Sequence, residues 1–339
     1  MKKNIFVTLF TIVFIIITLV SCSSSNPADV TKRQEKSTTD TVTTTKKPLT
    51  DSTNKPPVTG GNTVSTTVPD AFEQQPVVSP SEKIEIDSAL AGKGFLVIVS
   101  GDNKYSKEGL FTPDELDAKS AEDIALAGLI RIYGNKTDSN YKVKNIKVFM
   151  NIEAFSAFES MMATFKAVSG AGDVQVISAY DYTGDESLSS DAVTGLSVKL
   201  NVLSDKDSLT YPLNYGGNKV TVDGKEMTYL EWFEKNSAKF GFVYTGLTDD
   251  ENNSLANFRY VGTVHSKYMV DNSCKLSDYV GAIKSGELSE ITDANGGKWA
   301  VSYVKASETE KTELTVGEGA KYLVSGTGEG GFVLAIAKN

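Results

Sequence analysis

The sequence is poor in the residues that carry most metal and nucleophile chemistry. It contains one histidine, His265, and two cysteines, Cys22 and Cys274. A Ser-His-Asp triad would have to use His265, and no nucleophile-elbow sequence accompanies that residue. Two cysteines allow at most one disulfide, so the fold must rest mainly on an apolar core.

Basic residues are also fewer than acidic residues. The formal net charge is −9 at pH 7, from 34 Lys and Arg residues against 43 Asp and Glu residues. Nucleic acids and polyanionic cell-wall polymers bind through basic patches. We therefore expect neither class of polymer as an electrostatic partner.

The chain has a long apolar run at its N-terminus. Two lysines precede residues 6–20, a run that is short for a membrane span of about 20 residues but typical of a signal peptide. The run ends in Leu-Val-Ser-Cys at 19–22, which resembles the lipobox of bacterial lipoproteins. This predicts a signal peptide over 1–21 and acylation of Cys22, which would anchor the chain on the extracytoplasmic face of the cell membrane. An ordinary secretory signal and an uncleaved anchor helix are the alternatives.

Residues 22–82 predict a tether rather than a folded domain. They are mostly Ser, Thr, Pro, Lys, Asp and Val, with almost no aromatic residues. Such a segment cannot bury enough apolar surface to offset the entropy of ordering its backbone. We expect it to be disordered and to span very roughly 40 Å as a coil. If Cys22 carries lipid, Cys274 has no partner and is expected to be a small buried apolar residue.

From residue 83 the pattern changes to an α+β order of helices and strands. Asn151 is suited to the N-cap of a helix. The apolar face of that helix would carry Phe155, Phe158, Met162 and Phe165. The expected strands are 94–101, 144–150, 174–180, 197–203 and 240–246, and the expected helices are 122–131, 151–168, 229–238 and 266–285.

The C-terminal residues 287–339 predict only strands. The Gly-rich segment 326–331 resembles a phosphate-binding loop only superficially, because no helix pattern follows it. We expect a hairpin turn there.

One stretch carries a specific family resemblance. Phe-Arg-Tyr-Val-Gly at 258–262 and a closing segment at 274–280 have the spacing of the corresponding motifs in the VanY-like D-alanyl-D-alanine carboxypeptidases. Upstream of them, Thr-Gly-Leu-Ser-Val-Lys-Leu at 194–200 resembles an earlier motif of that family, so the pieces occur in the family's order. The resemblance runs from about residue 93 to 284. It implies a D,D-carboxypeptidase core of the hedgehog/D-Ala-D-Ala peptidase-like type over 83–286, with 287–339 as a small C-terminal β extension.

The zinc chemistry of that family does not carry over. The resemblance places the three metal-ligand positions at Ala192, Lys199 and Asn257 and the catalytic base at Ser254. The arginine expected to pair with the substrate carboxylate falls on Asp181. We therefore expect no zinc and no catalysis. The residues of the candidate vestigial cleft are Tyr180, Asp181, Ala192, Lys199, Ser254, Asn257, Arg259 and Tyr260.

Three residue roles stay open within this interpretation. Arg259 is either a structural arginine paired inside the fold or a contact to a ligand. His265 is expected to be an ordinary surface or capping histidine rather than a metal ligand. An acidic loop is either solvated or the site of an oxygen-liganded metal, and it contains Asp181, Asp185, Glu186 and Asp191.

The sequence thus favours a membrane-anchored lipoprotein with an inactive D,D-carboxypeptidase-like domain. Its expected partner, besides the membrane, is a peptidoglycan stem peptide or an envelope protein. One alternative is an active D-alanyl-D-alanine carboxypeptidase of peptidoglycan metabolism with a displaced metal site. Another is an unrelated solute-binding or adhesin-like lipoprotein.

Overall fold

The computed structural model describes residues 81–137, 139–250 and 253–338. The expected signal peptide, Cys22 and the expected tether up to residue 80 lie outside these ranges. Within them, none of the helices combines the length and the apolarity that crossing a membrane requires.

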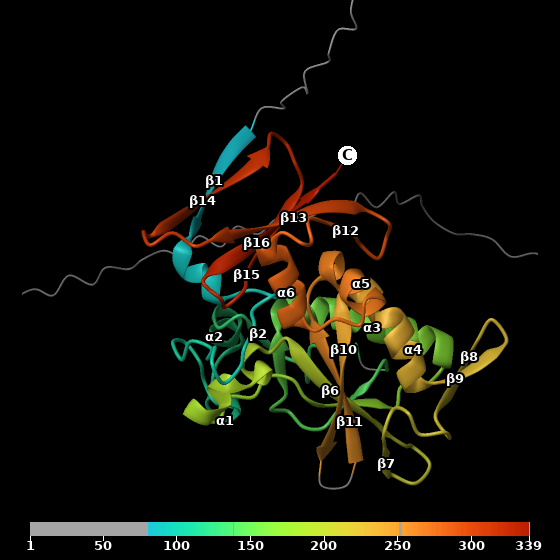
Figure 1. Cartoon of the computed structure of the whole chain (residues 1–339). Helices are drawn as coiled ribbons and strands as arrows, with labels where there is room; N and C mark the ends of the chain where they lie inside the picture. Colours follow the sequence, from blue (N-terminus) through green and yellow to red (C-terminus); the bar gives the residue numbers. More distant parts are fainter. Residues whose placement is uncertain (1–80, 138, 251–252, 339) are drawn as a thin grey trace, which may run out of the picture. The chain divides into compact units, whose positions relative to one another are not determined.

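A mixed sheet forms the centre of the folded part (Figure 1). Its pairs are antiparallel except for the parallel pair at one edge. The expected strand over 197–203 is confirmed, and its alternating apolar side chains are buried as a half-buried strand requires. The strands, in spatial order, are β10 (Phe242–Asp250), β11 (Asn253–Tyr260), β6 (Ser197–Leu203), β5 (Val174–Ser178) and β3 (Lys142–Val143), while β7 (Thr210–Tyr211) pairs with β6.

Two helices share an aromatic core with this sheet. In α3 (Ile152–Ser169) the side chain of Asn151 accepts hydrogen bonds from the backbone N–H groups of Glu153 and Ala154, which confirms the expected N-cap. The apolar face of α3 is buried as expected. In α4 (Tyr229–Asn236) a capping box of Thr228 and Glu231 starts the helix.

The expected strand over 94–101 is wrong. This segment is apolar because it is buried, with Leu96 and Val97 among its buried residues, but it pairs with no strand. Residues outside this segment supply hydrogen-bond partners for its backbone groups. Leu96 N–H donates to the hydroxyl of Ser325, and Ile98 N–H donates to the carbonyl of Thr327. A buried apolar run therefore forms an irregular segment because side chains and a distant loop supply its hydrogen bonds.

Other expected elements are shorter or divided. The helix over 266–285 is two helices, α5 (Thr263–Asp271) and α6 (Leu276–Ser285). The chain reverses between them at Ser273, whose φ is 48°. The expected strand over 144–150 is reduced to β4 (Phe149–Asn151), and the expected helix over 122–131 becomes α2 (Ala121–Leu126) and β2 (Leu129–Arg131). The strands β2 and β4 pair with each other.

The C-terminal residues form a second sheet, as the sequence indicates. It consists of β12 (Glu290–Thr292), β13 (Lys298–Lys305), β16 (Gly331–Ala337) and β15 (Tyr322–Gly326). The antiparallel pair β15–β16 confirms that 326–331 contains a hairpin turn. Helices α5 and α6 share a buried apolar cluster with this sheet, which includes Met269, Ile283, Trp299 and Val333. Figure 1 shows α6 directly beneath the sheet.

The first described strand does not belong to the core sheet. Strand β1 (Ser81–Asp87) begins two residues before the expected start of the folded domain and pairs with β14 (Lys311–Gly317) of the C-terminal segment. The start of the described chain is therefore paired with a strand of the C-terminal segment. The remaining elements are the 3-10 helices η1 (Ser88–Gly92), η2 (Asp185–Ser189), η3 (Asp191–Thr194) and η4 (Ser237–Phe240), the helix α1 (Pro113–Asp117), and the hairpin β8 (Lys219–Val222) and β9 (Lys225–Thr228).

Candidate functional site

Two of the expected site residues face each other across neighbouring strands. Lys199 on β6 and Asn257 on β11 are directly paired in the antiparallel register, so their side chains leave the same face of the sheet. Both side chains are half-buried. The amide nitrogen of Asn257 donates a hydrogen bond to the hydroxyl of Thr248. Lys199 has no hydrogen bond or ion pair with any residue that the structure describes.

The loop before β6 brings two further positions to this region. Ala192 lies in η3, and the N–H of Asp181 donates to its carbonyl oxygen at 3.1 Å. The side chain of Asp191 accepts a hydrogen bond from Ser197, which lies two residues before Lys199 on the same face of β6. The structure therefore gathers the positions 181, 192, 199 and 257 that the resemblance singled out.

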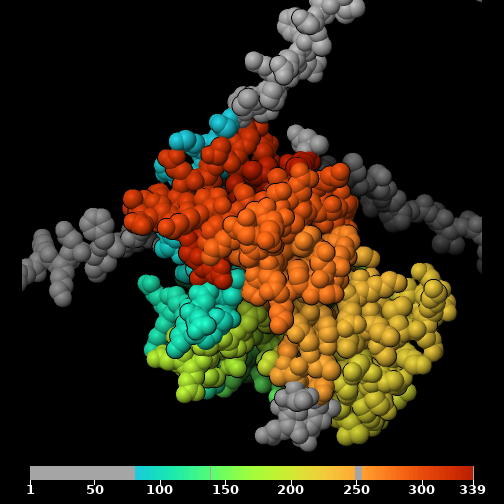
Figure 2. Space-filling model, viewed as in Figure 1, coloured from blue at the N-terminus to red at the C-terminus, as the bar shows by residue number. Residues whose placement is uncertain are grey.

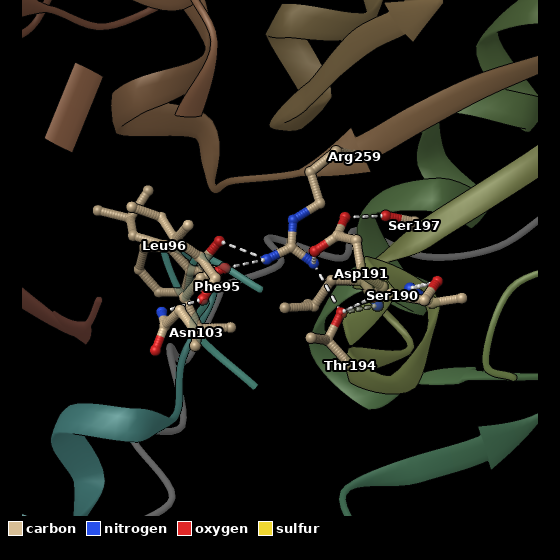
Figure 3. A network of polar contacts seen from close by, with 12 residues as sticks. Phe95, Leu96, Asn103, Ser190, Asp191, Thr194, Ser197 and Arg259 are labelled. Carbon is tan, nitrogen blue, oxygen red and sulfur yellow. Dashed lines mark hydrogen bonds and ion pairs between the residues drawn. The ribbon is translucent and has the colours of Figure 1, made fainter. Parts of the chain in front are cut away.

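Arg259 connects several segments of this region (Figure 3). Its side chain is 3% exposed, and its guanidinium lies 3.2 Å from the carboxylate of Asp191. It also donates to the hydroxyl of Thr194 at 2.6 Å and to the carbonyl of Val97 at 3.0 Å. A longer contact of 3.4 Å reaches the carbonyl of Phe95. Arg259 is thus paired inside the fold, and it connects β11, η3 and the irregular segment 94–101.

Two tyrosines expected in the cleft have structural roles instead. Tyr180 is buried in a separate apolar cluster, and its hydroxyl donates to the carbonyl of Phe111 at 2.7 Å. Tyr260 is adjacent to Arg259 on β11 and so projects from the opposite face, where its ring packs against Phe242. Burial raises the pKa of each phenol to about 12, so both stay protonated. Ser254 is half-buried near the start of β11.

His265 is not the surface residue that the sequence suggested. It is 1% exposed, and its Nδ1 lies 2.6 Å from the hydroxyl of Tyr279. The ring of Phe95 packs against it at 5.9 Å between centroids. Burial lowers the pKa of His265 to about 3. A histidine buried among aromatic rings is neutral near pH 7.

Two of the acidic residues of the expected loop form ion pairs. Asp185 pairs with Lys107 at 2.7 Å, and Asp191 pairs with Arg259 and Ser197. Asp181 is exposed. Among the residues described here, no group of three or more His, Cys, Asp or Glu side chains is arranged to hold a metal ion.

A cavity that the sequence did not suggest lies beside these residues. It measures about 520 Å³ and is lined mainly by apolar side chains, among them Met269 and Leu276. Three consecutive residues of β10, from Val243 to Thr245, form one wall. The hydroxyl of Thr245 contacts the carbonyl of Asn257 at 3.4 Å, so the cavity adjoins the candidate site.

Cys274 also lines this cavity. It is half-buried rather than fully buried, which corrects the expectation of a core residue. Burial raises the pKa of its thiol, and the nearby Asp278 adds to this effect. The thiol is therefore protonated near neutral pH and a weak nucleophile.

Comparisons with known proteins agree with the fold. No family model and no curated protein matches the chain. Among solved structures, the chain is similar to the vancomycin-resistance D,D-dipeptidase VanXYg, determined in complex with a D-Ala-D-Ala phosphinate analogue. The TM-score is 0.54 at 18% sequence identity, over 76% of this chain and 100% of that chain. The chain therefore has a D-Ala-D-Ala peptidase-like fold of mixed helices and sheet.

The residues at the positions where the resemblance places metal ligands do not fit a zinc ion. Zinc sites in proteins use imidazole, thiolate or carboxylate donors. Ala192 has no donor atom, Lys199 carries a positive charge, and the amide of Asn257 is already bonded to Thr248.

Proposed function

We propose that this protein is a lipid-anchored, non-catalytic D-Ala-D-Ala peptidase-like domain that binds peptide at the extracytoplasmic face of the cell envelope. The observation that carries the proposal is the register pair of Lys199 and Asn257. The resemblance places metal ligands at these two positions, and this chain has an ammonium and an amide there. The similarity of the fold to a D,D-dipeptidase supports peptide as the class of ligand.

The charge at this pair suggests how a peptide would be held. A zinc ion in an enzyme of this type supplies positive charge and an activated water. Lys199 supplies positive charge alone, and it is half-buried without a partner among the described residues. A peptide carboxylate would give it a charge-assisted hydrogen bond. Ser254 is a poor general base near neutral pH, so binding would not lead to hydrolysis.

The binding step can be tested with a D-Ala-D-Ala-terminated stem peptide. We expect the free carboxylate form to bind and the amidated form to bind at least about tenfold more weakly, because a charge-assisted hydrogen bond contributes about 1.5–3 kcal/mol. Lys199→Met should remove this difference, whereas Lys239→Met, an exposed lysine on η4, should preserve it. Isothermal titration calorimetry measures both. Equal affinity for the two peptide forms would contradict the role of Lys199.

The absence of catalysis is a separate prediction. The purified wild-type chain should contain no stoichiometric zinc and should not release D-Ala from a pentapeptide stem. The fourfold variant Ala192→His, Lys199→Asp, Ser254→Glu and Asn257→His should gain zinc, because it restores three donors and a base in one place. Lys199→Asp alone adds one donor and should not. Zinc-dependent D-Ala release by the wild type would establish the rival function, an active carboxypeptidase with a displaced metal site.

The lipid anchor is tested through Cys22, which lies outside the described residues. Cys22→Ala should abolish incorporation of labelled fatty acid and should release the protein from the membrane fraction or stall its processing. Cys274→Ala is the matched control, because it removes the other cysteine and should leave fractionation unchanged. A Cys22→Ala protein that is cleaved normally and remains in the membrane fraction would rule out the anchor.

A further inference from the structure

The cavity beside the candidate site runs along an open edge of the central sheet. Among the strands that the structure describes, β10 is the last one on its side of the sheet and pairs only with β11. Consecutive residues of a strand point to opposite faces. Val243 and Tyr244 therefore point to opposite faces, and both line the cavity, so the cavity extends around the edge of β10, next to the register shift between Tyr244 and Gly246.

The register shows which backbone groups point into that space. Phe242 is paired with Tyr260, and the N–H of Tyr260 donates in the other direction, to the carbonyl of Leu196. The backbone groups of Phe242 therefore point away from β11. Hydrogen bonding alternates along an antiparallel pair, so the N–H and C=O of Tyr244 point to the outer edge as well. An exposed edge of this kind is a template for another strand.

Two helical walls turn this edge into a groove. Helices α5 and α6 contribute Met269 and Leu276, and α4 contributes Glu234. In Figure 2 the gold surface in the region of α4 and the orange surface of α5 and α6 lie next to each other on the face shown. The mainly apolar lining suits an apolar side chain that projects sideways from an extended peptide.

The groove also carries a charge that lacks a counterion. Glu234 has no hydrogen bond or ion pair with any described residue. Partial burial raises the pKa of its carboxyl group, and the neighbouring Glu231 adds to this effect. Two basic residues also line the groove: Arg259, which is held by Asp191, and Lys275. A basic group on the occupant would complement Glu234.

We propose that the groove along β10 binds an extended peptide, which adds to the sheet as a further strand, places an apolar side chain between Met269 and Leu276, and directs a basic side chain to Glu234. This mode needs backbone hydrogen bonds and no terminal carboxylate. It is therefore distinct from the carboxylate contact proposed for Lys199, although both use neighbouring parts of the same surface.

The probe is the capped peptide acetyl-Thr-Val-Lys-Val-Thr-amide, titrated into the full-length protein in detergent. Binding is followed by calorimetry and by protection of Cys274 from alkylation in a Cys22→Ala background, where Cys274 is the remaining thiol. We expect saturable binding and protection of the thiol. Glu234→Gln should weaken affinity about fivefold, as loss of a partly exposed ion pair does. Glu287→Gln, an exposed acid outside the groove, should not.

Two further comparisons separate this proposal from its rivals. The same peptide with N-methyl groups on alternate residues cannot complete the strand pairing and should not bind. Lys199→Met should leave binding of the capped peptide unchanged, so failure of the carboxylate site and failure of the groove give different results. Equal binding of the N-methylated peptide, or no protection of Cys274 at millimolar peptide, would overturn the proposal.

Discussion

Asp191→Asn should lower the free energy of unfolding by about 3 kcal/mol, although Asp191 is itself partly exposed. The change leaves the guanidinium of Arg259 buried at 3% exposure without an opposite charge. Removing one partner of a buried ion pair costs about 3–5 kcal/mol, because the remaining charge is uncompensated. We expect the lower end of that range because the Asp191 side chain is 38% exposed and water screens the pair from that side.

The opposite substitution should cost less. Arg259→Met removes the buried charge together with its hydrogen bonds, and the carboxylate of Asp191 can then be hydrated. The carbonyl of Val97 and the hydroxyl of Thr194 lose a donor, which costs about 1–3 kcal/mol. The double variant should therefore be more stable than Asp191→Asn alone.

Urea unfolding followed by tryptophan fluorescence measures these differences. Asp185→Asn is the matched control, since it removes a carboxylate of the same region from an exposed pair with Lys107. Its unfolding midpoint should equal that of the wild type. If Asp191→Asn and Asp185→Asn unfold at the same denaturant concentration, Arg259 does not depend on Asp191, and the pairing in Figure 3 carries no stability.

This network shows what the sequence could and could not predict. The strand that carries Arg259 is not among the strands that the apolar pattern predicts, although the arginine could be expected to pair inside the fold. Its partners could not be predicted. Thr194 is 65 residues away, and Val97 is 162 residues away. Contacts of that range depend on how the elements pack, whereas apolar periodicity reports only on local structure.

The same limit explains the failure at 94–101. A continuous apolar run is consistent with a buried strand, yet the run alone cannot show where its backbone hydrogen bonds go. Here they go to Ser325, Thr327 and Arg259. By contrast, α3 was predictable because its N-cap, its apolar face and its terminal glycine all lie within a single stretch of chain.

The family resemblance grouped residues that local patterns cannot connect. It named Lys199 and Asn257, 58 positions apart in sequence, and the register pairs them directly. It failed for Tyr180 and Tyr260, which lie in apolar surroundings away from that face. The groove along β10 carried no sequence signal, because its lining combines residues of α4, β10 and the α5–α6 segment.

The second large effect is the contribution of His265 to the pH dependence of the free energy of unfolding. Burial against Phe95 and Tyr279 lowers its pKa to about 3, from about 6.5 in an unfolded chain. Below pH 6.5 the unfolded state therefore binds a proton that the folded state does not. The contribution of the neutral His265 to the free energy of unfolding is therefore fully present above pH 6.5, and it is lost progressively as the pH falls toward 3.

The size of this effect follows from the separation of the two pKa values. At pH 4.5 the unfolded histidine is about two pH units below its pKa, so protonation should cost the folded state about 3 kcal/mol relative to pH 7.5. Carboxylates also titrate in this range, so a variant is needed to separate their contribution to stability from that of His265. His265→Gln keeps a neutral polar group near Tyr279 and cannot take up the proton.

The decisive quantity is the stability difference between the wild type and His265→Gln, measured by urea unfolding at pH 7.5, 5.5 and 4.5. The carboxylates contribute equally to both proteins and cancel. We expect the wild type to lose about 3 kcal/mol relative to the variant between the highest and the lowest pH. A difference that stays constant over this range would mean that His265 binds its proton equally well in the folded and the unfolded chain. That result would contradict the assignment of a buried, neutral imidazole beside Tyr279.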